Sequence, residues 1–219
     1  MNLPFTSEQF FELFRDYNLF VWPIQFVFYV LVIVIFYYIF KSSLKGSRVI
    51  LFILSFLWGW MGIIYHLSFF SVINKAAFIF GLLFVIQGVF FLLSIVFNHY
   101  FLFSYRSNLY GITGAFLIIF SVLIYPILNI AAGHQFPASP TFGLPCPTTI
   151  FTLGLLLLNE KKNPLFILII PLLWSVVGFT AALTLGIYED ISLLIAGILS
   201  FILVIKKNRD IEKVTPLSV

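Results

Sequence analysis

Long apolar runs separated by short polar segments dominate the chain from residue 19 to residue 205. A helical run of about 20 apolar residues crosses the hydrocarbon core of a bilayer, where only helices or closed barrels satisfy their backbone groups. The pattern therefore predicts an all-α, polytopic membrane helical bundle of about seven transmembrane helices. The seven runs cover residues 19–40, 49–65, 78–97, 111–132, 148–158, 165–185 and 191–205.

Composition supports this class, because 62% of the residues are hydrophobic and only 9% are charged. In soluble domains about a quarter of the residues are charged. The 219 residues leave room for little besides the spans, so we expect a single membrane domain over residues 1–219 with a short cytoplasmic tail over residues 206–219. Pro23, Pro126 and Pro171 fall inside three runs and are expected to kink those helices.

Positive charge is divided unequally between the two sets of connections that seven spans create. One set contains only Arg15 and Lys75, and the other contains ten Lys and Arg residues. Because these residues accumulate in cytoplasmic loops, we expect the N-terminus outside and the C-terminus in the cytoplasm. This positive charge favours the lipid bilayer as the partner, and we expect no binding of nucleic acid. It does not determine the oligomeric state. The ten residues are Lys41, Lys45, Arg48, Arg106, Lys161, Lys162, Lys206, Lys207, Arg209 and Lys213.

The opening residues carry the signature of a short helix. Thr6 and Gln9 have the spacing of a capping box, and Phe5 and Phe10 have that of a hydrophobic staple. Further phenylalanines form an apolar stripe beside acidic residues. We therefore expect an amphipathic helix over residues 5–18, lying in the outer interface either as an anchor or as a lid.

The segment over residues 133–152, GHQFPASPTFGLPCPTTIFT, contains the only cysteine and four of the ten prolines. The run that follows, residues 148–158, covers only about half of a 30 Å hydrocarbon core. We therefore expect Pro145, Cys146 and Pro147 at membrane depth, in a re-entrant or Pro-rich outer loop between helices 4 and 5. The alternative is a helix that begins near Phe142. Irregular backbone at such depth is found where it lines a cavity.

Several reactive side chains fall on the outer face in this topology. His66 follows the second span, His134 follows the fourth, and Glu189 and Asp190 precede the last. With Cys146 they could provide imidazole, carboxylate and thiolate ligands for a soft metal ion such as zinc or copper. No pair has the close spacing of a metal motif, so hydrogen-bonded histidines that orient the loop are an equal alternative. The candidate binding residues are His66, His134, Pro145, Cys146, Thr148, Glu189 and Asp190.

Two classes of function fit these features. The first is binding or transport of a small solute or ion through an outer-face vestibule, with a metal ion as one form of that solute. The second is a membrane-embedded enzyme that uses Cys146 with His66 or His134 as its base. A structural membrane subunit is the remaining alternative. We assign no catalytic residue and expect a non-enzymatic role.

Three segments carry a resemblance to a known family. They are LPFTSEQFFELFRDYN with VWP following, WMGIIYHLSFFSVIN, and HQFPASPTFGLPCPTTIFTLGLLLL. Together they resemble an uncharacterised family of bacterial multi-pass membrane proteins, known only as a domain of unknown function. The resemblance extends over nearly the whole chain and implies a bacterial inner membrane, but it transfers no mechanism, substrate or site.

Overall fold

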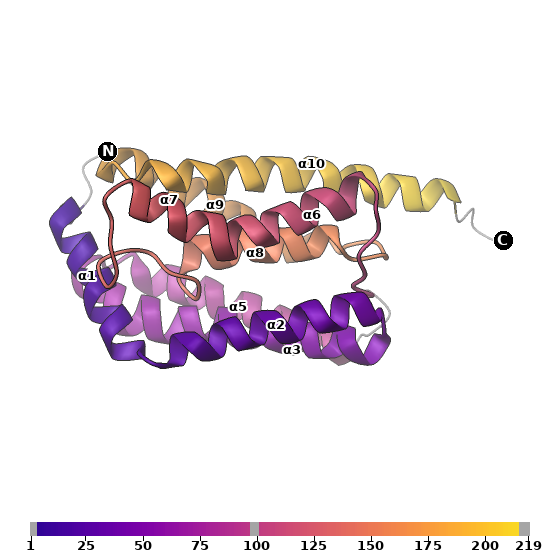
Figure 1. Cartoon of the computed structure of the whole chain (residues 1–219), viewed down its shortest axis with the longest axis horizontal. Coiled ribbons are helices and arrows are strands. Elements are labelled where there is room, and N and C mark those ends of the chain that lie inside the picture. Colours follow the sequence, from indigo (N-terminus) through magenta and orange to yellow (C-terminus); the bar gives the residue numbers. More distant parts are fainter. Residues whose placement is uncertain (1–3, 97–100, 215–219) are drawn as a thin grey trace.

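A computed structural model describes residues 4–96 and 101–214, and within these ranges the protein is an all-α bundle (Figure 1). The long helices lie side by side along one axis, and each runs opposite to the one before it. Two of them contain π-helical turns, Met61–Phe70 and Phe120–Ile124. The α-helices are α1 (Ser7–Val21), α2 (Ile24–Lys41), α3 (Leu44–Trp60), α4 (Ser71–Ile73), α5 (Ala77–Val96), α6 (Leu109–Ile119), α7 (Tyr125–Ala131), α8 (Pro145–Leu157), α9 (Phe166–Leu185) and α10 (Ile191–Val214).

Most of the predicted spans are long helices. In the described ranges, six helical stretches are long and apolar enough to cross a membrane. This confirms the helical bundle expected from the apolar runs. The six stretches are Ile24–Lys41, Leu44–Ile73, Ala77–Val96, Leu109–Ala131, Phe166–Leu185 and Tyr188–Lys213.

The remaining predicted run, residues 148–158, corresponds to α8, which forms the centre of the bundle. All of its residues except Cys146 are buried, as expected for a helix that is apolar on every side. The prediction that Pro145 and Pro147 lie in an irregular loop is wrong, because both belong to the first turn of α8. Proline is well placed there, since the first amide groups of a helix have no intrahelical partner. With 13 residues, α8 is about 20 Å long. A hydrocarbon core is about 30 Å thick, so residues 132–144 would cover the depth that α8 does not.

The N-terminal helix α1 crosses one end of the bundle (Figure 1). Its capping box is present, because Thr6 Oγ1 accepts from the amide of Gln9 and Gln9 Oε1 accepts from that of Thr6. Phe5 stacks on Phe10 with their ring centroids 5.4 Å apart, which confirms the staple. Phe14 is buried whereas the acidic residues of α1 are exposed. We call the part formed by α1, residues 74–76, residues 132–144 and residues 186–190 the α1 end.

Three predicted boundaries differ from the structure. Pro23 separates α1 from α2 rather than kinking one helix, so residues 19–21 belong to α1. The second span continues through a π-helical turn to Ile73 instead of ending at residue 65. The last helix runs to Val214, so most of the expected tail is helical. Pro126 and Pro171 do lie within continuous helical stretches.

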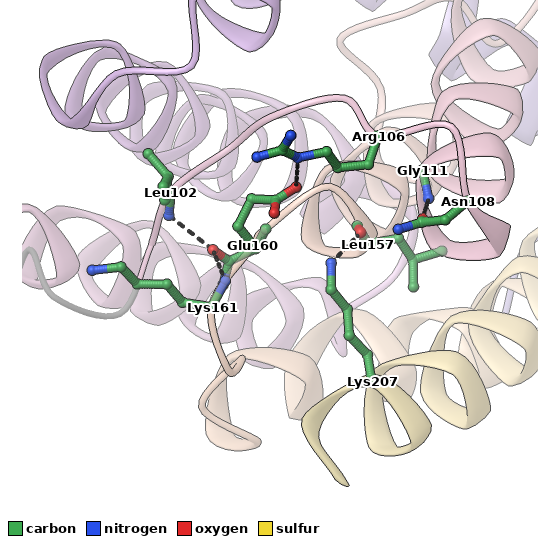
Figure 2. Close-up of polar contacts among 9 residues, drawn as sticks. Leu102, Arg106, Asn108, Gly111, Leu157, Glu160, Lys161 and Lys207 are labelled. Carbon is green, nitrogen blue, oxygen red and sulfur yellow. Dashed lines mark hydrogen bonds and ion pairs between the residues drawn. The ribbon is translucent and has the colours of Figure 1, made fainter. Parts of the chain in front are cut away.

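The opposite end, here called the basic end, comprises the turn from α2 to α3, residues 101–108, residues 158–165 and the end of α10. Figure 2 shows its polar contacts. The buried Asn159 accepts from the amides of Leu102 and Lys161 at 2.8 and 3.2 Å. Lys207 Nζ donates to the Leu157 carbonyl at 2.8 Å (Figure 2), at the C-terminus of α8, where a cation is favourable. Hydrogen bonds from side chains to backbone groups therefore hold the segments of the basic end together.

Candidate functional site

A cavity of about 110 Å³ lies at the α1 end. Phenylalanines of α1 cover it, and side chains from the π-helical turn Met61–Phe70, α5, α8 and α9 form its walls. Most of these walls are apolar, and the side chains with polar atoms are Tyr65, Asn74, Cys146, Trp174, Thr180 and Asp190. The lining residues used below are Phe10, Phe14, Tyr65, Phe70, Phe80, Pro145, Cys146, Trp174, Gly178 and Asp190.

Asp190 places a buried carboxyl group at this cavity. It ends the short turn Tyr188–Asp190 that leads into α10, and it is 5% exposed. The Tyr125 hydroxyl donates to Asp190 Oδ1, and the Cys146 thiol lies near the carboxyl group. Within the described ranges no Lys, Arg or His forms an ion pair with Asp190. The carboxyl group therefore has a hydrogen-bond donor but no counter-ion.

Trp174 adds a donor that is not used. Its side chain is buried, and Nε1 has no hydrogen-bond partner within the part of the chain that the structure describes. Gly178 follows one turn later on α9. A Cβ atom at Gly178 would lie 2.7 Å from Leu193 Cδ2 of α10, 3.6 Å from Cys146 Sγ and 3.8 Å from Trp174 Nε1. The glycine therefore lets α9 pack closely against α10 beside both polar atoms.

His134 and Glu189 form an ion pair beside the cavity. Their Nδ1 and Oε1 atoms are 2.7 Å apart, and the Glu189 side chain is 3% exposed against 21% for His134. Phe11 of α1 packs on the imidazole with a centroid distance of 4.4 Å. Five of the predicted residues therefore lie at the same end of the bundle: His134, Glu189, Asp190, Cys146 and Pro145. The imidazole of His134 pairs with the Glu189 carboxylate and not with the Cys146 thiol.

His66 does not lie after the second span as predicted. It is inside the π-helical turn Met61–Phe70 and fully buried, because the helix continues beyond residue 65. Aromatic rings surround it, with Phe84 and Trp174 at centroid distances of 4.6 and 5.1 Å. Both of its ring nitrogen atoms lack a partner among the described residues. Trp174 lines the cavity and His66 does not. His66 therefore packs on Trp174 without facing the cavity.

Thr148 has a structural contact. Its hydroxyl oxygen accepts from the amide of Gly143 at 3.2 Å, and Gly143 has a φ of +99°, a conformation that favours glycine. Thr148 thereby fixes the residues that lead into α8. It is buried and is not among the residues that line the cavity.

The attachment of α1 to residues 132–144 depends on residues that the sequence pattern did not single out. Asn18 Nδ2 donates to the carbonyls of Pro137 and Ser139 at 2.7 and 2.8 Å. Its Oδ1 atom accepts from Gln25 and Thr141 at 2.8 and 3.0 Å. The side chain of Asn18 is fully buried. The sequence pattern contained little signal for this role, because Asn18 is one of several polar residues in an amphipathic helix.

Tyr17 supports the same attachment. Trp60 Nε1 donates to its hydroxyl at 2.9 Å, and the hydroxyl donates to the Gly143 carbonyl at 3.4 Å. Burial raises the pKa of Tyr17 above its ordinary value, and the indole donor acts in the opposite direction. Tyr17 therefore stays neutral and serves as a hydrogen-bonding group. Together with Asn18 it holds α1 over the cavity.

The predicted metal ligands do not converge. Within residues 4–96 and 101–214, no three His, Cys, Asp or Glu side chains are grouped so that they could hold a metal ion. Cys146 faces Asp190, His134 pairs with Glu189, and His66 is enclosed by rings. The arrangement instead suits a small, largely apolar molecule with a polar group that reaches Asp190 or Trp174.

The family model described as "Family of unknown function (DUF6064)" matches residues 7–214. The chain therefore belongs to this family, which confirms the resemblance to a domain of unknown function. No curated protein matches the chain, and no solved structure does.

Proposed function

We propose that this member of the DUF6064 family binds and transports a small organic solute through the cavity beneath α1. The observation that carries the proposal is a buried carboxyl group, Asp190, facing a mostly apolar cavity. The indole donor of that cavity, Trp174 Nε1, has no hydrogen-bond partner among the described residues. Ionisable groups within membrane segments are costly and most often mark a solute or ion pathway. Concave, apolar sites with few polar groups are typical of small-molecule binding.

The distribution of charge supports an outward-facing cavity in a bacterial inner membrane. The α1 end carries only two basic residues, Arg15 and Lys75, whereas the basic end carries ten. By the positive-inside rule the basic end faces the cytoplasm. The N-terminus is then outside, the C-terminus is inside, and α1 lies in the outer interface.

In this proposal α1 is the lid of the cavity. Phe10 and Phe14 form part of the cavity lining, while the acidic face of α1 is exposed. The contacts of Asn18 couple α1 to residues 132–144, so a movement of α1 would carry that loop with it. A solute from outside would enter when both move away from the cavity.

The alternative of an enzyme that uses Cys146 has less support. A cysteine nucleophile needs a nearby base, and the thiol faces a carboxyl group and not an imidazole. His134 is engaged by Glu189.

The test compares solute uptake by cells that express wild-type protein, Asp190→Asn or Asp16→Asn. Asp190→Asn removes the buried acid and keeps the size of the side chain and an oxygen for Tyr125, whereas Asp16 is exposed on α1. We expect untargeted mass spectrometry of cell contents to find solutes that accumulate or are depleted with wild-type protein and Asp16→Asn but not with Asp190→Asn. Identical profiles for all three and for cells without the protein would contradict the proposal.

A further inference from the structure

The charged groups around the cavity are unbalanced. The α1 end holds five of the eight acidic residues of the chain but only two basic ones. Three of these acids, Glu8, Glu12 and Asp16, are exposed on α1, and Glu189 and Asp190 are buried below. An excess of one sign at the mouth of a cleft raises the local concentration of solutes of the opposite sign. The cavity end is therefore suited to cations.

Asp190 and Glu189 differ in how their charge is compensated. Glu189 has His134 at 2.7 Å. Among the described residues, Asp190 accepts from the neutral Tyr125 hydroxyl and has the neutral Cys146 thiol nearby. A buried carboxylate without a counter-ion is costly, and a bound cation would remove that cost. Asp190 also lines the cavity, so such a cation would meet it from that side.

The remaining walls suit an organic cation better than a metal ion. Tyr65, Phe70, Phe80 and Trp174 all line the cavity, and aromatic faces attract ammonium groups. A metal ion would need several oxygen, nitrogen or sulfur ligands, and the described residues offer no group of three. The cavity of about 110 Å³ is comparable with sites that take one small ring, since a cavity of roughly 150 Å³ binds benzene.

Trp174 gives an independent indication of a ligand. Its Nε1 atom is buried without a partner among the described residues, beside the Cys146 thiol. An indole N–H donates only, so it requires an acceptor, such as an oxygen of a bound molecule. An anion would satisfy it but would be repelled by Asp190, whereas a cationic molecule that also carries an oxygen satisfies both groups.

We infer that the solute is a small organic amine, bound as its ammonium form with Asp190 as counter-ion and the aromatic side chains as walls. This inference rests on the proposed function, because it assigns the chemical class of the solute in the same cavity. Asp190 binds the charge, Trp174 binds an oxygen where one is present, and α1 covers the bound molecule.

Calorimetric titration of the full-length protein in detergent micelles, with pyrrolidine and with tetrahydrofuran, tests the inference. Both probes are saturated rings smaller than benzene, and only pyrrolidine is charged at neutral pH. We expect wild-type protein to bind pyrrolidine at least about tenfold more tightly. Asp190→Asn, which keeps an oxygen for Tyr125, should remove this preference, and Asp16→Asn on the exposed face of α1 should retain it.

The outcomes separate the two proposals. Equal binding of both probes to wild-type protein would overturn the assignment of an amine and leave a solute cavity in place. Binding of neither probe would overturn the solute cavity as well. If Asp190→Asn fails to fold, the preference of the wild-type protein between the two probes still decides the assignment.

Discussion

The two ends of the bundle differ in how they treat buried polar groups. At the basic end, Asn159 and Asn163 bind each other and nearby backbone groups. At the α1 end, Asp190 has no counter-ion, and Trp174 Nε1 has no partner within the described ranges. An unsatisfied buried group costs about 1–3 kcal/mol. Gln87, Asn129, Thr149 and Ser200 also have buried polar atoms without a partner among the described residues. Asp190 and Trp174 differ from these because they line the cavity, where a bound molecule would satisfy them.

Breaking the attachment of α1 should have the largest effect. Asn18→Ala removes four buried hydrogen bonds, so we expect a loss of about 3 kcal/mol or more of stability. Thermal unfolding in detergent measures this loss. Asp16→Ala, on the exposed face of the same helix, should change stability by less than about 0.5 kcal/mol. A similar small effect for Asn18→Ala would show that α1 is not held in this way.

The basic end should lose stability without losing solute binding. Lys207→Met removes the donor to the Leu157 carbonyl, and we expect a cost of about 1–2 kcal/mol. Binding of pyrrolidine should not change, because Lys207 lies at the opposite end from the cavity. A variant that kept full stability but bound the probe more weakly would contradict the division of roles between the ends.

The two described histidines should respond in opposite directions. Both nitrogen atoms of His66 are unpartnered, so His66→Leu should raise stability by about 1 kcal/mol. His134→Leu leaves Glu189 buried without its partner and should lower stability by a similar amount. Chemical denaturation of both variants provides the comparison. Destabilisation by His66→Leu would mean that the imidazole has a partner or a packing role that a leucine does not replace.

Surface ion pairs of the basic end should matter least. Arg106 pairs with Glu160 at 3.2 Å, with the arginine side chain 64% exposed. Exposed pairs of this kind contribute about 0–1 kcal/mol. Arg106→Ala and added salt should therefore each shift the unfolding temperature only slightly. A large shift would show that charge, rather than the hydrogen bonds of Asn159, holds this end together.

The sequence predicted the bundle because apolar periodicity and length determine which segments cross a membrane. It also predicted the capping box and staple of α1, since these depend on local spacing. It did not predict the position of His66. A histidine among apolar residues resembles the end of a span, and only the packing of rings around it showed that the helix continues.

Only part of the site was predicted from the sequence. Cys146, Asp190 and Glu189 stood out as rare reactive groups in an apolar chain, and the structure brings them to one end. Trp174 and Gly178 did not stand out, because a tryptophan and a glycine are ordinary in a membrane helix. Their role depends on α9 facing α8 at Cys146, and that pairing is a tertiary property.

Labelling of Cys146, the only cysteine, with a membrane-impermeant maleimide in intact cells tests the central claim most directly. The account predicts slow labelling from outside in wild-type protein and faster labelling in Asn18→Ala, where α1 is released. A control cysteine at Lys162, in a Cys146→Ser background, should react only after permeabilisation. Labelling of Cys146 only after permeabilisation, or no labelling even in Asn18→Ala, would contradict an outward-facing cavity beneath α1.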